Sequence, residues 1–418
     1  MILKLARKSL WNRRGTAILT LVSLAISVAL ILGINHLRHQ AKQSFTSTIS
    51  GTDLIVGARS GSANLLLYAV FRIGNATNNI SWKSYETISK SRDVDWTIPI
   101  SLGDSHRGFR VLGTDHNYFE HYRYGDRRDL VFARGGPFEG VYDTVLGAQV
   151  ARELGYEIGD KIVIAHGLGD VSFSKHDDKP FTVVGILEPT GTPVDRTVHV
   201  MLEGIEAIHL GWQQGARMPG RGVSAEEALQ QELKPEAITA FLVGLESRMA
   251  TFRLQRAINE YRKEALTAIL PGVALAELWD VLGMVENMLI IVAFLVLLAT
   301  LVGMTTTLLS SMKERQRELA ILRAVGAHAG YLFALIEIEA LLLALLGVVF
   351  GILLLTVSLF MLQPWLASEF GLFISANPLN GEALWISAGV LLLAALLSLI
   401  PSVVAYRRAL ADGLSVRT

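Results

Sequence analysis

The chain has 418 residues, of which 51% are hydrophobic and 18% are charged; its 38 lysines and arginines balance 38 acidic residues, and it has no cysteine. This much apolar surface excludes a disordered chain, and the absence of a net positive charge argues against a nucleic-acid-binding protein. The lack of cysteine excludes a disulfide framework, a thiolate zinc site, an iron–sulfur cluster and a cysteine nucleophile.

Four long stretches contain no charged side chain: 16–37, 287–312, 340–368 and 383–405. A helix needs about 20 apolar residues to cross the hydrocarbon core of a bilayer. We therefore predict four transmembrane helices at these places, with the third extending from 331 to 363. The first is interpreted as a retained helix because its apolar run is too long for a signal peptide and no cleavage-site pattern follows it.

Lysine and arginine gather beside these helices on one side of the membrane. Before the first helix lie Lys4, Arg7, Lys8, Arg13 and Arg14; between the second and third lie Lys313, Arg315, Arg317 and Arg323; and after the fourth lie Arg407, Arg408 and Arg417. The connection between the third and fourth helices instead carries Glu369 and Glu382. The positive-inside rule predicts that both termini and the 313–330 segment are cytoplasmic and that the 364–382 loop is external. Residues 1–15 then form a cytoplasmic interfacial segment, and 406–418 form a cytoplasmic tail.

This topology places 38–286 outside the cytoplasm as a large α+β domain between the first and second helices. Strands are predicted from β-branched runs bounded by Gly, Pro and Asp at 53–56, 96–100, 109–113, 144–147, 161–165, 181–187, 197–202 and 240–245. Helical patterns occupy 149–154, 204–210 and 247–268. The Gly-, Gln-, Glu- and Ala-rich piece at 211–235 is predicted to be an inserted lobe. Residues 38–49 and 275–286 are predicted to extend the first two membrane helices as a stalk.

The external domain contains no recognisable catalytic or metal-binding pattern. No G-x-S-x-G is present, and the chain has no G-x-x-x-x-G-K-[ST] for nucleotide hydrolysis. His36 and His39, and the run His176-Asp177-Asp178, lack the spacing of a zinc site, so they are interpreted as solvated polar residues. We therefore predict no catalytic residue, no metal site and no cofactor in this chain.

The most informative segment follows the second helix. Five charged residues, Glu314, Arg315, Arg317, Glu318 and Arg323, alternate with Leu319, Ile321, Leu322 and Val325. This pattern predicts an amphipathic helix that ends at Gly326. Such a helix suits docking into a groove on a cytoplasmic partner, although a charged connector at a membrane surface would show a similar composition.

Here the chain resembles the FtsX/MacB/LolC (type VII) ABC-transporter permeases, whose corresponding segment reads R-x-x-E-[IL]-x-x-L-R-A-[LV]-G-A. Arg315 and Glu318 match its first two charged positions, and 322–327 match its end. The ending around Pro401 and 406–409 resembles that of the family, but it lacks the late proline. In the external domain, Leu154-Gly155 and the Gly159-Asp160 run before a strand are also similar.

The resemblance implies a chain that contacts a separate cytoplasmic ABC ATPase subunit, which binds ATP and Mg²⁺. The positions implied to contact the ATPase are Glu314, Arg315, Arg317, Glu318, Leu322 and Arg323. It also implies a second permease copy, most simply in a homodimer, and a possible periplasmic adaptor or receptor. The bacterial inner membrane is the implied location, with membrane lipid as a further contact.

Small and acidic residues in the membrane helices add further candidates. Ala25, Ala29 and Gly33 recur at four-residue spacing, which permits close helix contact and, given that the family dimerises through this helix, indicates a dimer interface. Gly347-x-x-x-Gly351 fits contacts inside one chain equally well. Glu337 and Glu339 near the start of the third helix are interpreted as a structural pair with Arg323 or an interfacial basic residue, rather than a proton site.

The leading hypothesis is the permease subunit of an ATP-driven complex that transmits cytoplasmic ATP hydrolysis to the external domain. Its work would be export or extraction of a lipophilic, peptide or lipoprotein substrate. Alternatives are a non-transporting regulator of an external hydrolase or sensor and, from another class, a membrane-anchored enzyme.

Overall fold

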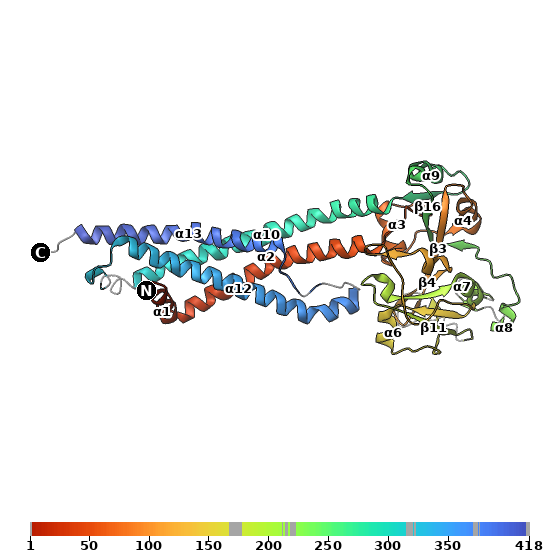
Figure 1. Cartoon of the computed structure of the whole chain (residues 1–418), viewed down its shortest axis with the longest axis horizontal. Helices are drawn as coiled ribbons and strands as arrows, with labels where there is room; N and C mark the ends of the chain where they lie inside the picture. Colours follow the sequence, from red (N-terminus) through yellow and green to blue (C-terminus); the bar gives the residue numbers. More distant parts are fainter. Residues whose placement is uncertain are drawn as a thin grey trace. The chain divides into compact units, whose positions relative to one another are not determined.

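A computed structural model describes residues 2–166, 178–210, 212–213, 216–217, 223–314, 321, 323–370, 375 and 377–414 (Figure 1). The chain divides into two compact units. We call them the membrane unit (1–40, 282–365 and 374–418) and the sheet unit (41–281 and 366–373). Each unit is described separately.

The membrane unit is built from four long helices and one short helix. They are, among the described residues, α1 (Ile2–Asn12), α2 (Arg14–Thr48), α10 (Pro271–Glu314), α12 (Ala329–Phe370) and α13 (Gly381–Leu414). Residues 41–48 of α2, 271–281 of α10 and 366–370 of α12 belong to the sheet unit. Within the described residues, α2, α10, α12 and α13 are long and apolar enough to cross a membrane. The predicted fold class, four membrane helices with a large α/β domain between the first two, is confirmed.

The helices extend beyond the predicted membrane segments. α2 and α10 include the stretches expected as a stalk, α12 runs to Phe370, and α13 continues to Leu414. The apolar run used for prediction marks only what hydrocarbon can accommodate, whereas the backbone hydrogen bonds of a helix continue into polar sequence until a cap or loop stops them. Pro401 lies inside α13 without ending it.

Glycines in α12 allow α2 to pack closely against it. A Cβ built on Gly347 would lie 2.5 Å from Leu24 Cδ2, and one on Gly351 would lie 2.8 Å from Val28 Cβ. Both contacts are shorter than real Cβ contacts, so any larger residue at either glycine would push α2 away. The α2–α12 seam, defined by these four residues, is the observed use of the Gly-x-x-x-Gly pattern.

The sheet unit is organised around one 11-stranded mixed sheet with order β17-β1-β16-β3-β4-β12-β8-β11-β7, β10 pairing with β3 and β9 with β11. The bounds of its strands are β1 Leu54–Ala58, β3 Val94–His106, β4 Phe109–Thr114, β7 Phe132–Gly135, β8 Asp143–Leu146, β9 Lys161–Ile162, β10 Ala165–His166, β11 Phe181–Leu187, β12 Thr197–Met201, β16 Ala240–Leu245 and β17 Leu266–Ile269. Short pairs outside the sheet are β2 (Ile80–Ser81) with β15 (Ala237–Ile238), β5 (Arg123–Tyr124) with β6 (Arg128–Asp129), and β13 (Trp212–Gln213) with β14 (Ala216–Arg217).

The long strand β3 belongs to both halves of this sheet. Residues 94–100 pair with β16, and residues from Ser101 onward pair with β4. Pro99 lies just before the change of partner; because proline has no N–H, it fits where it need not donate to a second neighbouring strand. The register against β4 shifts between Leu102 and Ser105, which is a bulge immediately after the change of partner.

Helices cover the sheet and close its cores. They are α3 (Ser62–Ala69), α4 (Trp82–Ser89), α5 (Asn117–His121), α6 (Ala148–Leu154), α7 (Leu202–His209), α8 (Ala225–Ala228) and α9 (Thr251–Asn259). One buried cluster joins α4 and α9 to β1 and β16, and another joins α6 and α7 to β8, β11 and β12. A third, containing Tyr118, Phe119 and Phe138, includes residues from α3, α5 and both halves of the sheet. Hydrophobic burial therefore holds the two halves together, in addition to the strand that they share.

One predicted helix of the sheet unit differs from the structure, and one predicted lobe is described only in part. The helix predicted at 247–268 is wrong in its second half, because α9 ends at Asn259 and the chain returns as β17, pairing with β1. Asn259 Oδ1 accepts a hydrogen bond from Ala268 N at 2.7 Å across this turn. In the lobe expected at 211–235, the described parts are the β13–β14 pair and 223–235, which includes α8; residues 211, 214–215 and 218–222 lie outside the described residues.

Asp115 has an unfavourable carboxylate environment in the sheet unit. Its Oδ1 atom is buried with no hydrogen-bond partner. Burial raises the pKa of this carboxyl group to about 7; a backbone hydrogen bond from Asn117 opposes the increase, and repulsion from Glu203 adds to it. Because this pKa is above the unfolded value of about 3.9, the group favours folding at low pH and this contribution is lost as pH rises through 7.

Replacing Asp115 with asparagine should therefore stabilise the protein at pH 8 by roughly 2–4 kcal/mol and have little effect near pH 4. Thermal unfolding at both pH values would measure the change, with the exposed Asp126→Asn as the matched control. Equal effects of Asp115→Asn at the two pH values would contradict the assigned cause.

Candidate coupling site in the membrane unit

The candidate site lies where α10 ends and α12 begins, which we call the loop end of the membrane unit. Glu314 is the last residue of α10, and Ala329 is the first of α12. Of the predicted ATPase-contacting residues, Arg315, Arg317, Glu318 and Leu322 lie outside the described residues. The structure places Arg323 in the short connection and Glu314 at the helix end.

The described part of the connection is one helical turn with an exposed apolar side. Val325 N donates to Ile321 O at 3.1 Å, and Gly326 N donates to Arg323 O at 2.9 Å. Gly326 has φ +103°, a left-handed conformation that ends the turn where the sequence predicted a stop. Ile321 is 63% exposed and Val325 is 84% exposed, and their spacing of four puts them on one side of the turn. Exposed aliphatic side chains at a loop suit contact with another protein.

An apolar cluster ties three helices together beside this connection. Met312 of α10, Ile336 of α12 and Ala405 of α13 are buried against one another, with Leu309 and Val404 packed around them. Met312 lies two residues before the end of α10. The cluster therefore joins α10, α12 and α13 close to the connection.

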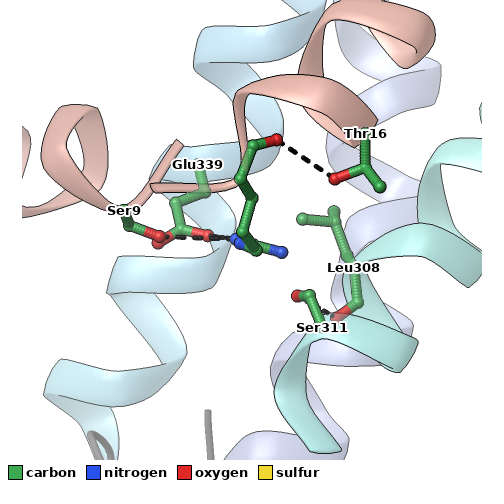
Figure 2. Close-up of polar contacts among 6 residues, drawn as sticks. Ser9, Thr16, Leu308, Ser311 and Glu339 are labelled. Carbon is green, nitrogen blue, oxygen red and sulfur yellow. Dashed lines mark hydrogen bonds and ion pairs between the residues drawn. The ribbon is translucent and has the colours of Figure 1, made fainter. Parts of the chain in front are cut away.

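A buried ion pair adds the N-terminal helix to this group. Arg13 Nη2 lies 2.8 Å from Glu339 Oε2 of α12, and the side-chain exposures are 14% and 1%. The same Nη2 atom donates to Ser9 Oγ of α1 at 3.3 Å. Figure 2 shows the Glu339 carboxylate beside Ser9, with Leu308 and Ser311 of α10 facing the same region. This contact holds the α1–α2 junction against α12.

The second acid, Glu337, contacts α13 instead. Its Oε1 accepts from Ser398 Oγ at 2.8 Å and its Oε2 accepts from Ser402 Oγ at 2.9 Å. The two serines are one helical turn apart, so a single carboxylate reaches both. Glu337 and Glu339 thus each connect α12 to a different helix, because residues two apart point to different sides of a helix.

The sequence interpretation of these acids was partly right. Glu339 pairs with an interfacial arginine, Arg13, as one of the stated alternatives proposed. Glu337 takes two serine hydroxyls, which were not among the expected partners. The signal was present as Ser398 and Ser402 at four-residue spacing in the uncharged stretch 383–405.

The predicted dimer-interface residues also have positions in the structure. Ala25 is 6% exposed, and its carbonyl oxygen lies 2.9 Å from a Cβ built on Gly351. A Cβ on Gly33 would lie 3.2 Å from Leu355 Cδ1, so this glycine also faces α12. Ala29 is partly exposed. The structure therefore gives Ala25 and Gly33 a partner inside the chain, and their role between two copies stays a prediction.

Polar contacts also join α2 to α10 and to the segment between α12 and α13. His36 Nε2 lies 2.7 Å from Ser375 O, and Arg38 Nε lies 2.9 Å from Glu286 Oε2 of α10. His36 is thus engaged with backbone, while His176 and Asp177 lie outside the described residues. The part of the chain that the structure describes contains no group of three or more metal-ligand side chains.

Removing one member of the Arg13–Glu339 pair should be far more harmful than removing both. Arg13→Met leaves a buried carboxylate without this cation and should cost about 3–5 kcal/mol, whereas Arg13→Met with Glu339→Leu should recover most of the loss. Thermal unfolding in detergent would show the difference, with the exposed neighbouring Arg14→Met as control. A double variant no more stable than Arg13→Met alone would refute the pair's importance.

Comparisons with known proteins agree with this architecture. The model for the MacB-like periplasmic core domain matches residues 17–258, and the model for the FtsX-like permease C-terminal matches residues 290–411. Comparison with curated proteins found no match.

Two solved structures resemble the chain at low identity. The periplasmic region of MacB from Actinobacillus actinomycetemcomitans is 12% identical, with 55% of this chain and 94% of that chain covered and a TM-score of 0.34. The extracellular domain of the noncanonic ABC-type transporter YknZ from Gram-positive bacteria is 13% identical, with coverages of 52% and 99% and a TM-score of 0.30.

The two family models together account for both parts of the molecule, the domain between the first two long helices and the three helices that follow. Four apolar helices and a MacB-like periplasmic domain indicate a protein of the bacterial inner membrane. Because the MacB-like model alone matches more than half of the sequence, the chain belongs to the MacB/FtsX family of permeases, the membrane component of ABC transporters.

Proposed function

We propose that this permease transmits ATP-driven movement of a separate cytoplasmic ATPase, bound at 313–326, to the sheet unit outside the membrane. The work performed is export or extraction of a lipophilic, peptide or lipoprotein substrate. The observation that carries the proposal is the exposed Ile321–Val325 turn held between two membrane helices whose ends are packed together.

The exposed turn has the chemistry of a docking element. Ile321 and Val325 offer apolar area, and Arg323 in the same turn supplies a cation for an acidic or carbonyl group on the partner. Apolar anchors surrounded by charged side chains are typical of protein interfaces. Glu314, Arg315, Arg317, Glu318 and Leu322 are the further contacts that the family resemblance implies.

The packing of the loop end supports transmission rather than passive anchoring. A push on the docked turn would act on α10 and α12, because the turn lies between these two helices in the chain. The Met312–Ile336–Ala405 cluster passes it to α13, and the Arg13–Glu339 pair passes it to the α1–α2 junction. Close-packed interiors shift as units rather than deforming locally, so all the membrane helices respond together.

The proposed complex has a defined orientation in the membrane and several further partners. Both termini and the loop end face the cytoplasm, and ATP with Mg²⁺ binds on the ATPase rather than on this chain. Two copies of the permease pair in the membrane, with Ala25, Ala29 and Gly33 near their interface. α1 lies on the lipid surface, with the exposed Leu3 and Trp11 directed into it. An adaptor or receptor meets the sheet unit.

Charging the docking turn should release the ATPase. Ile321→Asp with Val325→Asp should reduce copurification of the ATPase roughly tenfold or more, since each buries a charge at the interface. Glu318→Ala with Arg323→Ala should also reduce copurification of the ATPase. Quantitative pull-down and permease-dependent ATP turnover in membranes would measure both.

The control for this experiment is Phe252→Asp, which makes the same kind of change at an exposed apolar residue of the sheet unit. Normal ATPase binding and turnover in the Ile321/Val325 variant would reject the docking assignment. Mass spectrometry of the purified complex would add a test of the work performed: bound lipid, peptide or lipoprotein supports transport, and an external hydrolase or sensor without cargo favours a regulator.

The orientation can be tested by labelling a single introduced cysteine, because the chain has no cysteine of its own. A cysteine at exposed Asp126 should react in intact cells with a thiol reagent that enters the periplasm but cannot cross the inner membrane. One at exposed His328 should react only after the inner membrane is opened. The reverse pattern would overturn the proposed topology.

A further inference from the structure

The sheet unit contains a pocket that the proposed function does not use. Its volume is about 300 Å³, enough for a ligand of amino-acid size. It lies beside the β3 bulge, between the loop that follows α3 and strand β4. The lining residues are Gly74, Asn75, Ala76, Asn79, Leu102, Gly103 and Arg110.

Arg110 is the one charged residue in this lining, and its guanidinium is held in place from one side. Nη1 donates to Asn75 Oδ1 at 3.1 Å, and Nη2 donates to Gly74 O at 2.7 Å. A guanidinium has five N–H groups, so others are left for a ligand. Because its orientation is fixed by the pocket itself, less side-chain entropy is lost when a ligand binds.

The pocket has an excess of positive charge. Within the described ranges, Arg110 forms no ion pair with a carboxylate, and burial together with nearby Arg72 lowers the Arg110 pKa from its ordinary value. Burial and the neighbouring cation both disfavour the charged form of the guanidinium. An anion entering the pocket would compensate this positive charge.

The other lining groups limit what kind of anion fits. Asn75 Oδ1 and Gly74 O already accept hydrogen bonds from Arg110, and the amide groups of Asn75 and Asn79 remain as donors within the described structure. Ala76 and Leu102 supply apolar surface. A Cβ built on Gly74 or Gly103 would meet no atom within 4 Å, so the backbone at both glycines borders open space.

We propose that this pocket binds the carboxylate of a small ligand, with Arg110 as its counter-ion and a short apolar group against Ala76 and Leu102. A planar carboxylate matches the guanidinium, which can donate two parallel hydrogen bonds to it. The carboxylate belongs either to a free acid of amino-acid size or to the C-terminal residue of a peptide. The site is a ligand site of the sheet unit and does not depend on the ATPase.

The test is calorimetry on the full chain in phosphatidylcholine nanodiscs, without ATPase. The probes are N-acetylalanine, an N-acetylated tetra-alanine with a free carboxylate, the same peptide as its C-terminal amide, and inorganic phosphate. At least one carboxylate should bind, and the amide should bind at least tenfold more weakly. Tighter binding of the tetrapeptide identifies a chain end as the source, and equal or tighter binding of N-acetylalanine identifies a free acid.

Variants assign the binding to this pocket. Arg110→Gln should weaken carboxylate binding at least tenfold, and Arg110→Lys, which keeps the charge but not the fork, should weaken it less. Arg92→Gln, an exposed arginine of the same unit, should leave affinity unchanged. If Arg110→Gln does not fold, as judged by thermal unfolding, Arg110→Lys and Asn79→Ala still test the site, each with a severalfold loss expected.

Several results would overturn the proposal. They are absence of binding by both carboxylates, equal affinity for the amide, and wild-type affinity in the Arg110 variants. Phosphate binding more tightly than either carboxylate would refute the ligand class. Because no ATPase is present, these results are independent of whether the docking turn binds one.

Discussion

Hydrocarbon accepts neither unpaired backbone polar groups nor unpaired charge, and this constraint sets the arrangement of the whole chain. It requires that the membrane segments be helices, since a helix satisfies its own backbone. It also confines the ionisable residues to the ends of the helices and to the sheet unit, with two acids near the start of α12 as exceptions. Each exception has a donor from outside α12: Glu337 from two serines of α13, and Glu339 from Arg13 at the α1–α2 junction.

Glu337, Glu339 and the α2–α12 seam determine different aspects of how α12 packs. Between apolar helices in lipid there is little hydrophobic driving force, so close backbone approach at glycines and polar contacts supply the attraction. The seam fixes how close α2 and α12 come, because the glycines have no side chain to hold them apart. The Arg13 and Ser398/Ser402 contacts fix the rotation of α12, since each acid must face its own partner.

The sequence was sufficient for the membrane helices because an uncharged, apolar run of about 20 residues is rare outside helices that cross a bilayer. It was also sufficient to place most of the predicted sheet strands, whose β-branched runs are short and bounded by turn residues. The structure differs at two of them: β3 continues from the predicted 96–100 to His106, and the predicted 161–165 strand is divided into β9 and β10. The second half of 247–268 failed for a physical reason: residues such as Glu264 and Ala265 favour helix locally, while pairing with β1 and burial override that preference. The partners of Glu337 and Glu339 depend on helix rotation, which no single-helix pattern specifies.

The candidate site likewise combines features that a local sequence signal predicts with features that depend on contacts between distant segments. The end of the docking turn at Gly326 was predictable because a glycine after an amphipathic run is a local signal. The intrachain partners of Ala25 and Gly33 were not, since small residues at four-residue spacing suit any neighbouring helix equally. The Arg110 pocket had no sequence signature at all, because its wall comes from three separate segments, one of which is the β3 bulge.

The shared strand β3 has a mechanical consequence for the sheet unit. A tensile force between the two halves would run along covalent backbone through β3, rather than only across hydrogen bonds between strands. Regular pairing along that path is interrupted at the bulge from Leu102 to Ser105. Because Leu102 and Gly103 of β3 also line the Arg110 pocket, a force carried along this strand would act on the wall of that pocket.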